Sequence, residues 1–124
     1  MLDETLKYTL ETILEHISKC ETRFSKISSP EDFVATEHGN LVLDSIVTRL
    51  QVIGENVKNI AKKHPELLEK HTEIEWNKII RFRDFISHHY EMLDYEIFFK
   101  FAKIFFLNFI KPLPLNFQNS GNKC

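Results

Sequence analysis

Apolar side chains recur every three or four residues along most of this chain, the spacing that places them on one face of a helix. One such run extends from Leu2 to Phe24, and a second from about Leu41 to Lys63. In the second run the stripe consists of Leu43, Ile46, Val47, Leu50, Ile53, Val57 and Ile60. No period-two alternation typical of a strand accompanies these runs. The pattern therefore predicts an all-α protein.

Turn-forming residues divide the chain between these runs. Ser29 and Pro30 are suited to cap and begin a short helical turn over residues 31–38, which the Gly39-Asn40 pair should end. The His64-Pro65 pair should end the second helix, and residues 66–72 are predicted to form a polar connection.

Two further helices are predicted in the second half of the chain. The third should span about residues 74–88, and the fourth should run from Tyr95 to Ile110 with Asp94 as its N-cap. The fourth is apolar on almost every side, so several neighbours or a partner chain must bury it. It is too short and too interrupted by lysine to span a membrane well. We therefore expect an up-and-down antiparallel bundle of four to five helices that dimerises, with residues 1–115 as one domain and residues 116–124 as a flexible tail.

Gly54 lies in the middle of the second predicted helix, where glycine costs about 1 kcal/mol relative to alanine. Close packing of another backbone would explain it, and simple tolerance of a weak position is the alternative. The next two residues, Glu55 and Asn56, are candidates to orient a group on a neighbouring helix.

Composition narrows the classes of function. The 124 residues include 43% apolar and 27% charged residues, which is ordinary for a globular domain, and the formal net charge is -2. A nucleic-acid ligand would therefore need a local basic patch. Asp3 and Glu4 occupy the place where a signal peptide carries basic residues, and Cys20 and Cys124 have no metal-type spacing. These features favour a cytoplasmic protein.

The densest chemistry lies in residues 81–90, RFRDFISHHY. On a regular helix Asp84 and His88 stand one turn apart, so the carboxylate could orient the imidazole. Arg83 precedes His88 by five residues and would lie about 140° around the helix. Either the helix unwinds near His88, or two copies of the motif converge at a symmetric interface. The simplest alternative is an amphipathic helix that merely ends in polar residues.

These groups suit RNA cleavage without a metal ion, because the ribose 2′-hydroxyl supplies the nucleophile. His88 would transfer protons, and Arg83 would stabilise the charge that develops on the phosphate. Ser87 is a less suitable nucleophile, since neighbours in sequence point to different helix faces. A metal site built from His64, His71, His88 or His89 is a further hypothesis, although adjacent histidines also diverge.

At these residues the chain resembles the HEPN superfamily, and more closely its HepT-like branch, whose motif is Arg, four residues, His, any residue, Tyr. Arg83, His88 and Tyr90 match it position for position, and Asp84 takes the place of a polar residue that often follows the arginine. Residues 51–55, QVIGE, are similar to the signature of the family's second helix. The resemblance covers roughly residues 1–115, with Trp76 and Ile79 leading into the motif.

The resemblance implies a helical homodimer with an RNase site of Arg83, His88 and a supporting Asp84. It also implies a role as the toxin of a bacterial toxin-antitoxin pair. The antitoxin would be a minimal nucleotidyltransferase that transfers AMP from ATP onto Tyr90, where added phosphate would block substrate. No cofactor is expected. The alternative is a catalytically inactive subunit that binds nucleotide or docks a nucleotidyltransferase.

Overall fold

The computed structural model of the protein describes residues 4–89, 92 and 94–109, and the regular elements in that part are all helical. They are α1 (Glu4–Phe24), the 3-10 turn η1 (Pro30–Phe33), α2 (Glu37–Lys63), α3 (Pro65–Lys70), α4 (Trp76–His89), α5 (Tyr95–Ile104) and the π-helical turn η3 (Phe105–Phe109). The predicted all-α helical bundle is confirmed.

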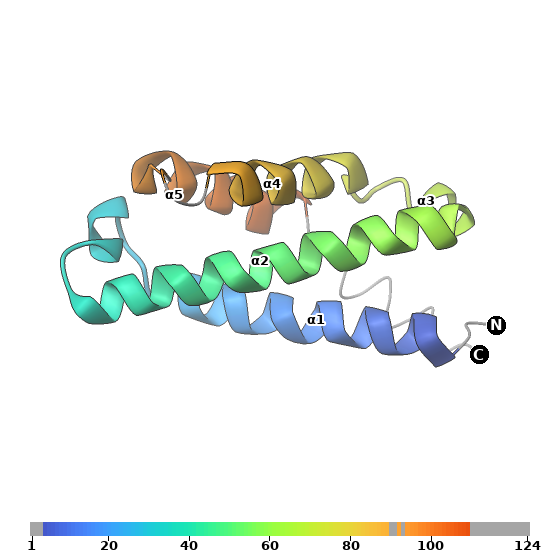
Figure 1. The fold of residues 1–124 in the computed structure, drawn as a ribbon, viewed down its shortest axis with the longest axis horizontal. Coiled ribbons are helices and arrows are strands. Elements are labelled where there is room, and N and C mark those ends of the chain that lie inside the picture. The colour runs from blue at the N-terminus through green and yellow to red at the C-terminus, as the bar shows by residue number, and fades with distance from the viewer. Residues whose placement is uncertain (1–3, 90–91, 93, 110–124) are drawn as a thin grey trace.

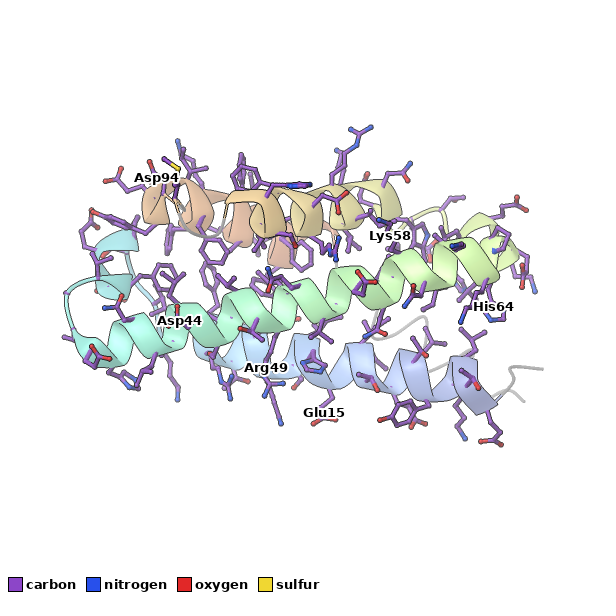
Figure 2. All side chains as sticks on the ribbon, viewed as in Figure 1. Glu15, Asp44, Arg49, Lys58, His64 and Asp94 are labelled. Carbon is purple, nitrogen blue, oxygen red and sulfur yellow. The ribbon has the colours of Figure 1, made fainter. Side chains whose placement is uncertain are left out.

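Helix α2 is the central element of the bundle. Figure 1 shows α1 and α4 on opposite sides of α2, both running antiparallel to it. Six of the seven predicted stripe residues of α2 are buried, and Leu43 is half-buried. No polar or charged residue is buried in the described part of the chain, and Figure 2 shows Glu15 and Asp94 on its outer surface. Apolar burial between α2 and its two neighbours therefore stabilises the fold.

The predicted break at Gly39-Asn40 is wrong, because α2 begins at Glu37. Thr36 is its N-cap and accepts a hydrogen bond from the Gly39 N–H at 2.9 Å. The glycine serves packing, since a Cβ there would collide with the main-chain oxygen of Asp32 in η1. Ser29 caps η1 in a capping box with Asp32, and Pro30 opens the turn as predicted.

The predicted polar connection after α2 is also wrong in part. Residues 65–70 form the short helix α3, which Pro65 begins and which buries Leu67 against α2. Proline suits the first helical position because its missing N–H has no partner there. A single buried leucine is too weak a periodic signal to predict such a helix.

The predicted third helix is confirmed as α4, displaced by one or two residues at each end. The last predicted helix begins as expected, since the Asp94 carboxylate accepts from the N–H groups of Glu96 and Ile97. It ends earlier, at Ile104, and continues as the π-helical turn η3. Residues 110–124, including the predicted tail, lie outside the described residues.

Helix α5 and η3 are only partly covered by the rest of the chain. Phe98, Ala102, Phe105 and Phe106 are buried. The exposed apolar row of α5 and η3, defined here as Ile97, Phe101, Ile104 and Leu107, is 39 to 55% exposed. No helix in the described part of the chain is long and apolar enough to cross a membrane.

The contact between His16 of α1 and Arg49 of α2 predicts a dependence of stability on pH. The Nη1 of Arg49 lies 2.9 Å from Nδ1 of His16, and because a guanidinium only donates, the ring nitrogen must accept and the ring must be neutral. Burial and the Arg49 charge lower the pKa of His16. The stabilisation is therefore present above the unfolded-state pKa of about 6.5 and is lost as the pH falls through the lower native pKa.

We expect the free energy of unfolding, measured in urea, to fall as the pH is lowered from above about 6.5 to about 5. His16→Gln keeps an acceptor for Arg49 but cannot be protonated, so part of this fall should disappear in the variant. An identical pH dependence in both proteins would contradict the assignment to His16.

Candidate functional site

Helix α4 carries the described part of the motif, which runs from Arg81 to His89 along its second half. The backbone is α-helical from Arg83 to His88, so of the two alternatives the one in which the helix unwinds to bring these residues together is wrong. Tyr90, the predicted modification site, lies outside the described residues. The arginine and the histidine of one copy consequently point about 140° apart.

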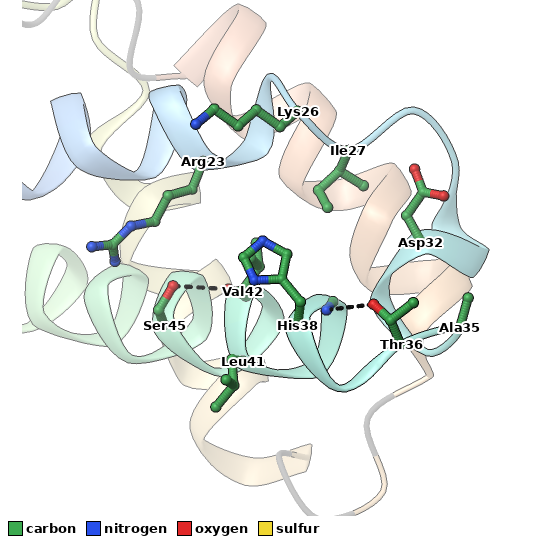
Figure 3. Close-up of a pocket in the computed structure, with 11 residues that line it drawn as sticks. Arg23, Lys26, Ile27, Asp32, Ala35, Thr36, His38, Leu41, Val42 and Ser45 are labelled. Atoms are coloured by element: carbon green, nitrogen blue, oxygen red, sulfur yellow. Dashed lines mark hydrogen bonds between the residues drawn. The ribbon is translucent and has the colours of Figure 1, made fainter.

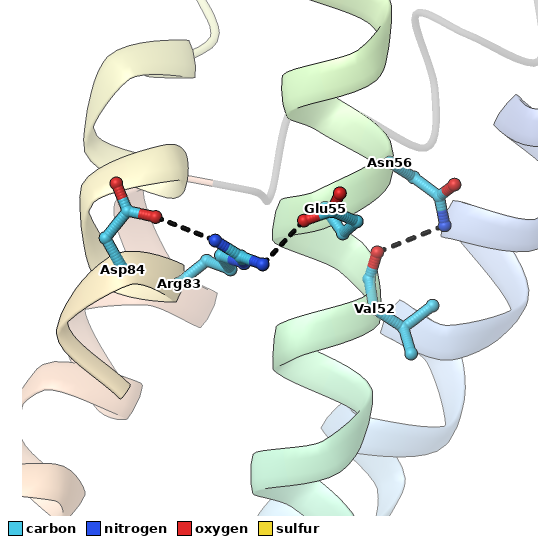
Figure 4. A network of polar contacts seen from close by, with 5 residues as sticks. All are labelled: Val52, Glu55, Asn56, Arg83 and Asp84. Carbon is cyan, nitrogen blue, oxygen red and sulfur yellow. Dashed lines mark hydrogen bonds and ion pairs between the residues drawn. The ribbon is translucent and has the colours of Figure 1, made fainter. Parts of the chain in front are cut away.

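Arg83 faces α2, and one carboxylate from α2 and one from its own helix α4 hold its guanidinium (Figure 4). Its Nη2 lies 2.6 Å from Oε2 of Glu55, and its Nη1 donates to Oδ1 of Asp84 at 3.0 Å. The Arg83 side chain is 26% exposed, and its Nε is buried without a hydrogen-bond partner. A buried donor without an acceptor costs about 1–3 kcal/mol, so the placement of Arg83 lowers the stability of the fold at this point.

Gly54 provides the space for this arginine. A Cβ on Gly54 would collide with Cβ of Arg83 and would lie 3.5 Å from its Cα. Of the two explanations for Gly54, the structure supports close packing of a neighbouring helix, and the group nearest to the glycine is the stem of the Arg83 side chain. Gly54 and Glu55 thus act together, because one admits the arginine and the other binds its charged end.

Two expected contacts around the motif differ in the structure. Asp84 was expected to orient the His88 imidazole, but its carboxylate is paired with Arg83, and no hydrogen bond joins it to His88 among the described residues. Asn56 was a candidate to orient Arg83, but its amide donates to the Val52 carbonyl of its own helix at 3.0 Å. Of the two candidates Glu55 and Asn56, Glu55 is the one that contacts Arg83.

His88 is exposed to solvent near the end of α4. Two residues that are seven positions apart on a helix lie two turns apart along the axis and differ by only about 20° around it. Arg81 therefore lies on the same side of α4 as His88, and Phe85 lies between them along the helix. The sequence alone left two interpretations of Arg81 open, a group that helps to hold phosphate and a solvated charge on the helix surface. The spacing of seven residues was the available signal for placing it beside His88.

Other reactive groups lie apart from the motif. Burial raises the pKa of the Cys20 thiol to about 12, so it stays protonated near neutrality and is a poor nucleophile. Nδ1 of His64 lies 3.4 Å from Oε1 of Glu66, and Nδ1 of His71 lies 3.4 Å from Oε1 of Glu73. Within residues 4–89, 92 and 94–109, no group of three or more His, Cys, Asp or Glu side chains is placed to hold a metal ion.

A cavity of about 690 Å³ opens between the end of α1, η1 and the start of α2 (Figure 3). Arg23, Lys26 and His38 contribute basic groups to its walls. The Asp32 carboxylate beside them accepts from the N–H groups of Ser28 and Ser29. No residue of the motif lines this cavity, so it is separate from the candidate site.

Comparisons with known proteins point to one family. The family model described as "Ribonuclease HepT-like" matches residues 13–111, which include every candidate residue of the motif. The chain is 37% identical over 87 residues to a protein of Caldanaerobacter subterraneus named "Putative RNase", covering 68% of this chain and 72% of that protein. It is 32% identical over 94 residues to "Probable ribonuclease HepT" of Thermococcus cleftensis, and the match covers 76% of this chain and 79% of that protein. No solved structure matches the chain.

Proposed function

The chain belongs to the HepT-like ribonuclease family of the HEPN superfamily, and from that membership we propose that it is an endoribonuclease with His88 and Arg83 as catalytic residues and Asp84 in support. The observation that carries the proposal is the family match across the whole of α4, together with an exposed imidazole at its end. Imidazole is the side chain best suited to exchange protons near neutral pH.

The proposed reaction is an internal transesterification. His88 removes the proton of a ribose 2′-hydroxyl, the oxygen attacks the adjacent phosphorus, and the bond to the 5′-oxygen breaks. A protonated histidine returns the proton to that leaving oxygen, which yields a 2′,3′-cyclic phosphate and a 5′-hydroxyl. Because the substrate supplies the nucleophile, we propose that the reaction needs no metal ion.

The Arg83 and His88 side chains of one copy point in different directions, and this favours an active site that two copies share. Since the two side chains of one copy point about 140° apart, one phosphate reaches both groups most easily where two motifs converge. Ile97 and Leu107, apolar residues exposed on α5 and η3, support association of two copies, because burial of such a surface is favourable. We therefore propose a homodimer as the active form.

The Arg83 ion pairs favour a second candidate function. A guanidinium held by Glu55 and Asp84 has a structural role in joining α2 to α4, and substrate phosphate must displace at least one carboxylate to reach it. This arrangement is what a catalytically inactive subunit that binds nucleotide or docks a nucleotidyltransferase would also have.

We further propose that the protein is the toxin of a toxin-antitoxin pair and acts in the cytoplasm, with a minimal nucleotidyltransferase as its antitoxin. That enzyme would transfer AMP from ATP to the Tyr90 hydroxyl and release pyrophosphate. The added phosphate charge would repel the RNA backbone.

Modification of Tyr90 predicts a specific change in mass. Coexpression with a minimal nucleotidyltransferase should increase the intact mass by one or more AMP units and should abolish RNA cleavage. Tyr90→Phe should keep the unmodified mass under the same conditions, with Tyr8→Phe, an exposed tyrosine of α1, as the control that remains modifiable. Addition of AMP to the Tyr90→Phe variant would contradict the assignment.

The test of the proposed activity is incubation of purified, unmodified protein with total cellular RNA in EDTA, followed by analysis of the product ends. Cleavage that leaves cyclic phosphates supports the transesterification. Intact RNA after incubation with unmodified protein would instead support the binding subunit.

A further inference from the structure

A shallow groove lies on the outer side of the bundle between α4 and α5. Its volume is about 280 Å³, and it is lined by Lys78, Arg81, Phe82, Phe85, Phe101 and Ile104. The floor is aromatic and aliphatic, and the two cations stand on the α4 side. The rings of Phe85 and Phe101 meet edge to face at 5.7 Å, and Phe101 remains 42% exposed.

The side of α4 that contributes Arg81 and Phe85 to the groove also carries His88. Arg81 precedes His88 by two turns, a rise of about 10.5 Å with an offset of about 20° around the helix. Phe85 lies between them, about 60° from His88. A strand running along this side would therefore pass the cation, the aromatic groove and the proton-transfer group in turn. Arg83, by contrast, faces α2 and is paired there.

From this arrangement, and resting on the proposed function, we propose that the groove binds single-stranded RNA next to the bond that is cut. One unpaired base would stack against the exposed face of Phe101, and the neighbouring phosphates would contact Arg81 and Lys78. Aromatic rings interleaved with cations are the combination that binds single strands, because every base presents a π-face and every nucleotide a phosphate. A duplex would not fit, since its bases are not available for stacking on protein.

The charges at the groove favour this ligand over other occupants. Arg81 is exposed and forms no ion pair with any described residue, and Nζ of Lys78 lies 3.8 Å from Oε2 of Glu75. Phosphate groups carry the charge that complements these two cations. Ile97 and Leu107, the two members of the exposed apolar row that do not line the groove, remain available to a second copy.

The experiment measures binding without cleavage, using a fluorescein-labelled decamer of 2′-O-methyluridine, whose blocked 2′-oxygen cannot attack. Fluorescence anisotropy would be recorded for the full-length protein over a series of salt concentrations. Arg81→Ala should weaken binding about tenfold at low salt and reduce the slope of log K against log salt by about 0.7, the value for one phosphate on a single strand. Phe101→Ala should weaken binding at least about fivefold.

Matched controls lie on α1, on the other side of α2 (Figure 1). Lys7→Ala removes the same charge as Arg81→Ala, and Tyr8→Ala removes an aromatic ring that is 71% exposed. Both should keep wild-type affinity. Equal losses in Lys7→Ala and Arg81→Ala would show only a general charge effect and would overturn the groove as a site.

Sedimentation of the same variants separates RNA from a second copy. If Phe101→Ala dissociates a dimer while the affinity for the decamer stays unchanged, the groove is an interface between copies and the proposal is wrong. A wild-type protein that does not bind the decamer would also overturn it. Cleavage of total RNA by the wild type would still decide the proposed function independently.

Discussion

Replacing His88 with alanine should reduce the rate of RNA cleavage by at least about a hundredfold, the lower end of what a positioned proton-transfer group contributes. The imidazole is exposed on α4, so its removal creates no cavity in the core and should leave the fold intact. The rate should be measured in single-turnover reactions with excess protein in EDTA, with circular dichroism as the check on folding.

Two other histidines provide controls for this prediction. His38→Ala removes an exposed imidazole on α2 that lines the cavity of Figure 3, away from the motif. His89→Ala removes the sequence neighbour of His88, which on a helix lies about 100° away. Both variants should cleave at close to the wild-type rate. A His88→Ala protein with wild-type activity would remove His88 from the mechanism, and loss in His89→Ala alone would move the role to that residue.

The helices with long apolar stripes were predictable from the sequence, whereas their local ends were not. The stripe of α2 determines both its existence and its buried face, because periodic burial dominates a helix of that length. Its start at Glu37 depends on a contact with η1, and Gly39 looks like a helix breaker until the Asp32 carbonyl beside it is known. Helix α3 has six residues and one buried leucine, too few to produce a period.

For the motif, too, only part of the structure was predictable from the sequence. Its position on a helix and the divergence of Arg83 from His88 follow from spacing alone. The partners of Arg83 do not, because Glu55 lies 28 residues earlier and meets it only through the packing of α2 against α4. Asp84 could have turned to either neighbour, and its choice of Arg83 follows from charge attraction over a short distance.

Replacing Gly54 with alanine should destabilise the protein by about 1–3 kcal/mol, although alanine is the better helix former. The added methyl would occupy the position of the Arg83 side-chain stem, so α4 would have to move away from α2. Higher helix propensity offsets this by only about 1 kcal/mol. Urea unfolding would measure the loss, and a variant as stable as the wild type would show that the two helices are less closely packed than the structure indicates.

A double-mutant cycle tests whether the Arg83 side chain is the group that makes Gly54→Ala destabilising. Arg83→Gly removes the side chain that the Gly54→Ala methyl would meet, so in this background the methyl should cost at least about 1 kcal/mol less than it does alone. Gly39→Ala is the matched control, because the atom that it would meet is the Asp32 main-chain oxygen, far from Arg83 in the chain, and its cost should be the same in both backgrounds. Additive costs for Gly54→Ala and Arg83→Gly would mean that the glycine has another purpose. Coupling, accompanied by slower RNA cleavage in Gly54→Ala alone, would link the close approach of α2 and α4 to the placement of the catalytic arginine.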